Sequence, residues 1–241
     1  MLCYVRRPDE HIVSQFHQKV RNASGDSARL DFASFDDFYW DRLTGDYYRY
    51  AMHMENWEKV FGKGSVEVRV FHRSTLQGSP VSDFIQWIGA DPERLAPEDR
   101  KPANESLDRI STEILLFLSY YRRREPDRIS QDDVSRALAT LRPAISDDRM
   151  RLDYKRAKQM HERFAKDHER LAARYLSPEH AAILLAPPVE RPPQPPLEAE
   201  VIHQRVMALF GDAELAQTAA EAIANRSRRP RVRRENRDRS L

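Results

Sequence analysis

The pattern of apolar positions is most distinctive at the start of the chain. A short apolar run at residues 2–5 ends in Arg6 and Arg7, and Pro8 follows directly. This pattern predicts a buried parallel strand over residues 2–6 and a helix over 8–22, because proline suits the first helical position. An apolar strand, then arginine, then a proline-led helix is how α/β folds build an anion site at the carboxyl end of a strand.

Further helices are predicted wherever apolar residues recur at helical spacing. Ser79 and Pro80 are expected to begin one of them and Gly89 to end it. Ser130, with Asp133 three residues later, is expected to cap another. The expected helical segments are 8–22, short pieces within 30–43, 46–61, 79–89, 107–124, a helix from 130 onward, 150–175, and one or two short helices within 197–225.

A second strand is predicted over residues 65–72. Valines at 66, 68 and 70 alternate with polar residues, so they are expected to share one face of the strand. With helices between the two strands, the expected fold class is α/β with a parallel sheet. A sheet of only two such strands leaves an edge that is open to pairing with another chain.

The carboxyl-terminal part is predicted to be an appendage to a domain that spans residues 1–178. Six of the ten residues 187–196 are proline, which predicts an extended linker over 179–196. Residues 197–225 are expected to form a short helical segment that is too small for a core of its own. Residues 226–241 hold eight arginines and two acids and are expected to be disordered.

Composition narrows the class of protein. The chain has 241 residues, of which 40% are hydrophobic and 32% charged. These values are typical of a soluble protein and allow one domain with an appendage. A net charge of +2 does not indicate a nucleic-acid partner for the chain as a whole. The single cysteine, Cys3, excludes an internal disulfide and favours a reducing, cytoplasmic location. No apolar run is long enough to span a membrane, and the histidines show no metal-ligand spacing.

Arg6, Pro8 and Ser14 carry a resemblance to a known family. Their spacing resembles the 3′-phosphate-binding motif of the sulfotransferases, enzymes that use 3′-phosphoadenosine-5′-phosphosulfate (PAPS). The resemblance implies that Arg6 and Ser14 hold the 3′-phosphate of this co-substrate. A forked guanidinium suits phosphate, and a serine almost two turns into the helix can donate to the same oxygens. Arg7 is expected to pair with an acidic neighbour instead.

The resemblance extends over residues 1–178. Tyr48, Trp57, Phe84 and the helix-like stretch 164–176 fall where carbohydrate sulfotransferases and their bacterial relatives have similar residues. The family implies a P-loop-like three-layer sandwich around a parallel sheet, with PAPS as co-substrate and no metal. Tyr48 becomes a candidate for lining the acceptor or adenine pocket.

Two parts of the family's machinery have no counterpart in the sequence. The glycine-rich loop that holds the 5′-phosphosulfate and the catalytic base both lie ahead of the arginine–serine motif in this family. The glycines at 62 and 64 precede a strand, whereas a phosphate loop follows one, so they are expected to form a plain turn. The chain is therefore expected to be an amino-terminally truncated form of the domain, with its catalytic residues unknown.

The resulting hypothesis is transfer of a sulfuryl group from PAPS to a hydroxyl of a glycan or small metabolite, with activity of the truncated chain left open. Histidines 11 and 17 flank Ser14, but nothing in the sequence places either beside an acceptor hydroxyl. Two alternatives stay open. One is a non-catalytic binding or scaffold module derived from a sulfotransferase; the other is a nucleic-acid-associated protein whose arginine-rich tail contacts the polyanion.

Overall fold

The computed structural model describes residues 1–22, 45–76, 78–96, 107–141 and 149–228. Contacts divide the chain into two compact units. Unit 1 comprises Met1–Gln15, Phe38–Glu105 and Arg151–Pro192. Unit 2 comprises Phe16–Asp37, Ser106–Met150 and Pro193–Leu241.

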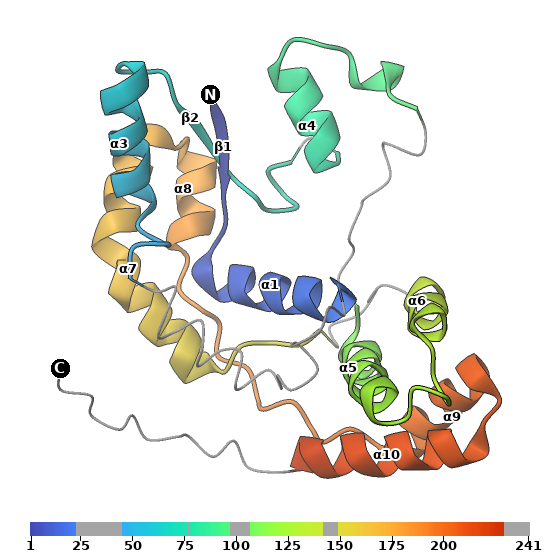
Figure 1. The fold of residues 1–241 in the computed structure, drawn as a ribbon. Helices are drawn as coiled ribbons and strands as arrows, with labels where there is room; N and C mark the ends of the chain where they lie inside the picture. Colours follow the sequence, from blue (N-terminus) through green and yellow to red (C-terminus); the bar gives the residue numbers. More distant parts are fainter. Residues whose placement is uncertain (23–44, 77, 97–106, 142–148, 229–241) are drawn as a thin grey trace. The chain divides into compact units, whose positions relative to one another are not determined.

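Unit 1 is built around two parallel strands, as the sequence predicts. The elements that contribute to it are β1 (Leu2–Val5), the first half of α1 (Pro8–Asn22), α3 (Tyr50–Phe61), β2 (Glu67–Val70), α4 (Pro80–Trp87), the 3₁₀ turn η2 (Pro92–Arg94), α7 (Tyr154–Tyr175) and α8 (Pro178–Leu185) (Figure 1). The predicted strands and the helices 8–22 and 46–61 are confirmed, with the last shortened at its start by a turn.

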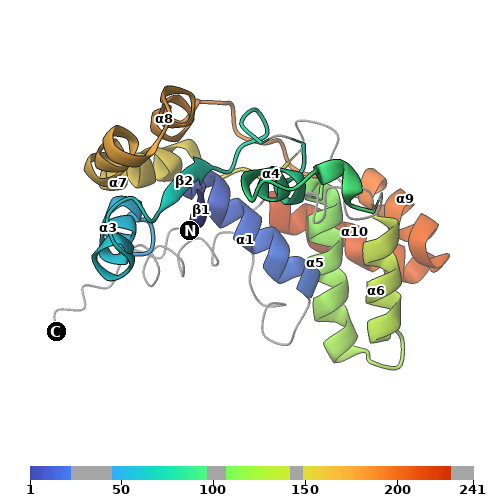
Figure 2. The same cartoon turned by 90° about the horizontal axis from the view of Figure 1, so that it is seen from above.

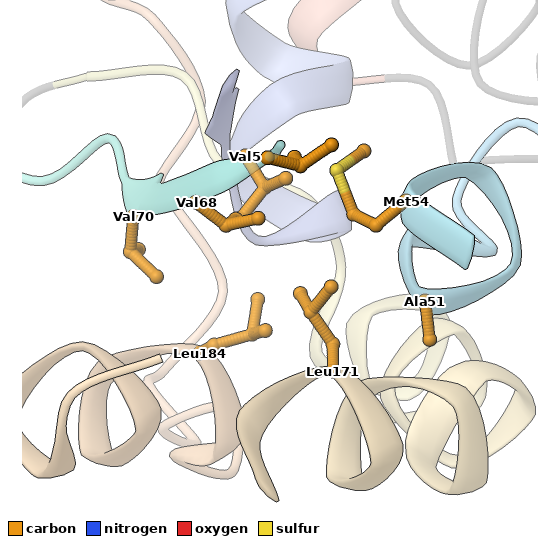
Figure 3. Packing of buried hydrophobic residues seen from close by; sticks show 8 residues of the cluster. Val5, Ala51, Met54, Val68, Val70, Leu171 and Leu184 are labelled. Atoms are coloured by element: carbon orange, nitrogen blue, oxygen red, sulfur yellow. The ribbon is translucent and has the colours of Figure 1, made fainter. Parts of the chain in front are cut away.

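The sheet has an apolar face and a polar face. The strands pair in parallel with Val5 opposite Val70 and Tyr4 opposite Arg69. Side chains of a strand alternate between faces, and the predicted common face of the valines is confirmed. Figure 3 shows these valines pointing toward side chains of α3, α7 and α8, and the core comprises Val5, Ala51, Met54, Val66, Val68, Val70, Leu171 and Leu184.

The polar face of the sheet contacts α4. Asp83 of α4 is 1% exposed, and it accepts hydrogen bonds from the Tyr4 hydroxyl and, at 3.0 Å, from Nη1 of Arg69. The Trp87 indole donates to Glu67 Oε2 at 2.8 Å. Helices therefore contact both faces of an α/β unit, and within the described residues the sheet consists of the two predicted strands.

Side chains and backbone geometry terminate several helices where the sequence predicts. The Ser79 hydroxyl caps α4 by accepting from the backbone N–H of Ser82 at 3.0 Å. Ser130 and Asp133 form a reciprocal capping box at the start of α6. Gly89, just past the end of α4, has a φ of 77°, a backbone conformation that favours glycine.

Unit 2 consists of helices. It contains α5 (Arg109–Arg124), α6 (Gln131–Thr140), α9 (Ala199–Phe210) and α10 (Ala213–Arg228), and α5 packs against α6, α9 and α10 (Figure 2). Gly211, with a φ of 67°, ends α9 and allows α10 to fold back on it. Segments 107–124 and 197–225, expected in separate parts of the chain, thus belong to one unit. Residues 197–225 alone have too little apolar surface to form a core, and packing against α5 completes that core.

The boundaries of the carboxyl-terminal segments differ from those expected. Residues 178–185 form α8, so the extended linker begins at Ala186 and not at 179. Leu184 explains the difference, because its burial in the unit 1 core holds this stretch in a helix. Of the predicted tail 226–241, the first three residues continue α10, and 229–241 lie outside the described residues, as do the helical pieces expected within 30–43.

Candidate functional site

The carboxyl ends of β1 and β2 meet at one edge of the sheet, because the strands are parallel and in register. Arg6 follows β1 and Phe71 follows β2. The guanidinium carbon of Arg6 lies 5.6 Å from the centre of the Phe71 ring. In α/β folds this edge, together with the amino end of the following helix, is where ligands bind.

Arg6 is held firmly at its backbone and more loosely at its side chain. The Tyr50 hydroxyl donates to the Arg6 carbonyl oxygen at 2.7 Å, which ties the strand end to the start of α3. Within the described ranges the guanidinium makes one ion pair, Nε to Glu10 Oε2 at 3.3 Å, and its side chain is 30% exposed. Arg6 is therefore a fixed cation that solvent reaches.

Ser14 lies on the same side of α1 as the partner of Arg6. It comes one helical turn after Glu10, and residues four apart share a face of a helix. Ser14 is half-buried, and among the described residues its hydroxyl makes no hydrogen bond. The structure thus pairs Arg6 with Glu10 just inside α1, and Ser14 follows one turn later on the helix face that carries Glu10.

Arg7 is neutralised by an acid, as the sequence predicts. Its Nε and Nη2 donate to the two carboxylate oxygens of Asp9 at 3.1 and 2.9 Å. The two side chains are 14% and 19% exposed. This two-pronged pair leaves Arg6 as the more available of the two cations.

Aromatic rings line the next stretch of α1. His11 Nδ1 lies 3.1 Å from the Tyr48 hydroxyl, and its Nε2 lies 3.2 Å from Nε2 of Gln15. Burial, with the Arg6 charge nearby, lowers the pKa of His11 to about 4, so the ring is neutral at physiological pH. The Tyr47 ring lies tilted against His11, with ring centres 5.6 Å apart, and the residue is 46% exposed.

Tyr48 belongs to the core, as expected of the aromatic residues between 47 and 57, and its ring does not meet solvent as the lining of an open pocket would. Its side chain is completely buried, with the ring 5.5 Å from that of Phe164 and 6.1 Å from that of Tyr50. The neighbouring Tyr47 is the ring that meets solvent. The sequence does not distinguish the two, since both lie in the turn ahead of α3.

The loop after β2 adds polar groups that sequence reasoning missed. His72 Nδ1 lies 2.9 Å from the Ser74 hydroxyl, and the Thr75 hydroxyl donates to the Val70 carbonyl oxygen at 2.8 Å. Arg73 between them is exposed. Because β1 and β2 are neighbours, this loop starts at the same edge of the sheet as Arg6. The signal available in the sequence is Arg73, a basic residue directly after the strand predicted over residues 65–72.

The glycines at 62 and 64 form a turn between α3 and β2, as predicted. Their φ values are 95° and 78°, a backbone conformation that favours glycine. The Gly64 N–H donates to the Glu58 carboxylate at 2.7 Å, and that carboxylate also accepts from the Tyr175 hydroxyl at 2.9 Å. This N–H therefore already has an anionic partner from the chain itself.

The described ranges contain no group of three or more His, Cys, Asp or Glu residues placed to hold a metal ion. None of the helices in those ranges combines the length and apolar character that crossing a membrane requires. Comparisons with protein-family models, curated proteins and solved structures gave no match. The chemistry at the carboxyl edge of the sheet is therefore what indicates a function.

Proposed function

We propose that this chain is sulfotransferase-like and that Arg6 and Ser14 bind the 3′-phosphate of PAPS. The observation that carries the proposal is their placement. Arg6 directly follows a parallel strand. Its side chain pairs with Glu10 on the following helix, and Ser14 lies on the same face of that helix.

The electrostatics of this edge favour a phosphate. The first backbone N–H groups of α1 carry a partial positive charge, and Arg6 adds a full charge with a donor fork that matches phosphate oxygens. The hydrogen bond from Tyr50 to the Arg6 carbonyl oxygen fixes the stretch of backbone from which this side chain extends. Less conformational entropy is then lost on binding.

The exposed ring of Tyr47 supports a nucleotide rather than a simple anion. The Tyr47 ring lies against His11. His11 is on α1, the helix that also carries Ser14, one turn ahead of Gln15. A tyrosine with 46% of its surface exposed offers a face on which an adenine base can stack. Phosphate binding and base stacking together would suit an adenine nucleotide.

The proposed reaction is transfer of a sulfuryl group to a hydroxyl of a glycan or small metabolite. In such a transfer the acceptor oxygen forms a bond to sulfur, the bond from sulfur to the 5′-phosphate oxygen breaks, and the acceptor loses its proton. PAPS becomes 3′-phosphoadenosine 5′-phosphate. We assign Arg6 and Ser14 to anchoring the nucleotide. We assign no described residue to the sulfuryl group or to the acceptor hydroxyl. The P-loop-like three-layer sandwich belongs to the same proposal.

Calorimetry with 3′-phosphoadenosine 5′-phosphate tests the proposal. Arg6→Ala is expected to weaken binding by about tenfold to a hundredfold and Ser14→Ala by about threefold to tenfold, the range for charged and neutral hydrogen bonds. Arg7→Ala is the matched control, because Arg7 is already paired with Asp9, and it should change affinity little.

Adenosine 5′-monophosphate, which lacks the 3′-phosphate, completes the test. It should bind more weakly than 3′-phosphoadenosine 5′-phosphate and should respond little to Arg6→Ala. Failure of the wild-type chain to bind 3′-phosphoadenosine 5′-phosphate, or equal affinity in the wild type and both variants, would overturn the proposal. Sulfate transfer from PAPS to a panel of hydroxylated acceptors then separates an enzyme from a non-catalytic module with the same site.

A further inference from the structure

We propose that Glu10 is a built-in competitor for the anion site: its carboxylate occupies Arg6, so a phosphate binds only as the Arg6–Glu10 ion pair opens. This inference rests on the proposed function, since it concerns the same site. It adds a residue that sets the affinity of the site and that the phosphate-binding motif does not include.

The geometry of the ion pair carries the inference. Glu10 Oε2 lies 3.3 Å from Nε of Arg6, and the side chains are 34% and 30% exposed. A single-contact pair that water partly reaches is weak, because water solvates both charges when they separate. The Glu10 carboxylate therefore occupies the guanidinium without closing the site permanently.

The neighbouring pair shows the contrast. Asp9 holds Arg7 through two hydrogen bonds of 2.9 and 3.1 Å, with both side chains less than one-fifth exposed. Two parallel hydrogen bonds are stronger than one and more specific in geometry. Of the two adjacent arginines, only Arg6 has a partner that a phosphate can readily displace.

The position of Glu10 makes its charge matter twice. It precedes Ser14 by one helical turn on the same face of α1, so a phosphate held by Arg6 and Ser14 would lie beside the Glu10 carboxylate. Glu10 first competes for the guanidinium and then repels the bound dianion. Both effects lower the affinity for phosphate, and both disappear when the carboxylate is neutralised.

Calorimetry with 3′-phosphoadenosine 5′-phosphate on Glu10→Gln, at low ionic strength, tests this role. Glutamine keeps the shape and polarity of the side chain but removes its charge. We expect binding about threefold to tenfold tighter than wild type, from the loss of a weak ion pair and of repulsion between partly exposed charges. The gain should shrink as salt is added, because salt screens exposed charges.

Asp9→Asn is the matched control. Asp9 is also an acid in the first turn of α1, so its removal costs the same favourable interaction with the helix dipole, but it contacts Arg7 and not Arg6. Its effect on affinity should stay within about twofold, as is usual for a charge outside the binding contact. Thermal melts of both variants check that the fold is retained, and Glu10→Ala serves as a second variant should Glu10→Gln not fold.

The outcomes separate this inference from the proposed function. If neither Arg6→Ala nor Ser14→Ala weakens nucleotide binding, the proposed function fails. If Arg6→Ala weakens binding but neither Glu10→Gln nor Glu10→Ala tightens it beyond Asp9→Asn, only the role of Glu10 is overturned. In the double variant Arg6→Ala/Glu10→Gln, the gain from losing the carboxylate should be smaller than in the single variant, because its partner is gone.

Discussion

The backbone N–H of Val70 donates to Nδ1 of His180 at 3.1 Å. This hydrogen bond lies on the edge of β2 that faces away from β1, where a further strand would otherwise pair. The Val70 carbonyl oxygen accepts from the Thr75 hydroxyl at 2.8 Å. Side chains from α8 and from the loop after β2 therefore block at Val70 the open edge that a two-stranded sheet is expected to leave.

His180→Ala is expected to destabilise the protein by about 1–3 kcal/mol, since it leaves the buried N–H of Val70 without a partner. Urea unfolding followed by circular dichroism measures this change. His203→Ala, a half-buried position on α9, is the control and should have a much smaller effect. Equal stability of His180→Ala and wild type would show that the hydrogen bond to the edge contributes nothing.

The pKa of His11 predicts a loss of stability in acid. The ordinary value is 6.5 and burial lowers it to about 4 in the folded protein. Between these values the unfolded chain takes up a proton that the folded chain does not, so the free energy of unfolding falls as pH falls through this window. Burial also lowers the pKa values of His168 and His180, which adds in the same direction.

His11→Asn removes the titrating group and is expected to flatten this dependence. Urea unfolding at several pH values across the window compares the slopes of stability against pH for wild type and variant. A His11→Asn protein with the full wild-type slope would contradict a depressed His11 pKa.

Asp83 is a buried carboxylate whose partners include Tyr4 and Arg69. Asp83→Ala is expected to lower the free energy of unfolding by about 1–3 kcal/mol. It removes the buried acceptor that Tyr4 and Arg69 share, whereas Arg69 keeps its ion pair with Glu67 at 2.9 Å. Tyr4→Phe removes one neutral donor and should cost about 1 kcal/mol. Chemical denaturation gives both values, with Glu179→Ala on the exposed side of α8 as a control. A smaller effect for Asp83→Ala than for Tyr4→Phe would be inconsistent with this network.

Arg73 should contribute to anion binding less than Arg6. It follows β2 at the same edge of the sheet, but its exposed side chain acts through a screened field. Arg73→Ala is expected to weaken binding of 3′-phosphoadenosine 5′-phosphate by about twofold to threefold at low salt, the size of an exposed charge interaction, and to have little effect at high salt. Calorimetry at two ionic strengths decides this, and a loss as large as that of Arg6→Ala would mean that Arg73 contacts the phosphate directly.

Tyr47 should contribute to base stacking and not to phosphate binding. Tyr47→Ala is expected to cost about 1–3 kcal/mol of binding free energy, for 3′-phosphoadenosine 5′-phosphate and adenosine 5′-monophosphate alike, whereas Tyr47→Phe keeps the ring and should bind nearly as wild type. Fluorescence or calorimetric titration measures both ligands. An effect limited to the ligand with the 3′-phosphate would place Tyr47 elsewhere in the site.

Local patterns in the sequence were enough to predict β1 and α1. The pairing of Arg7 with an acid was also predictable, because Asp9 is only two residues away. In each case the residues are close in the chain, so helix or strand geometry alone sets where their side chains lie. The same holds for the caps at Ser79 and Ser130.

Other features of the site depend on residues that are far apart in the chain. Phe71 contacts Arg6 because β2 pairs with β1, and Tyr48 rather than Tyr47 is buried because Phe164 of α7 packs against it. Local periodicity does not encode such contacts, since they arise when whole elements bury their apolar faces together. Short-range spacing thus accounts for the candidate phosphate ligands. The packing of distant elements decides which side chains surround them, because those contacts form only when the elements come together.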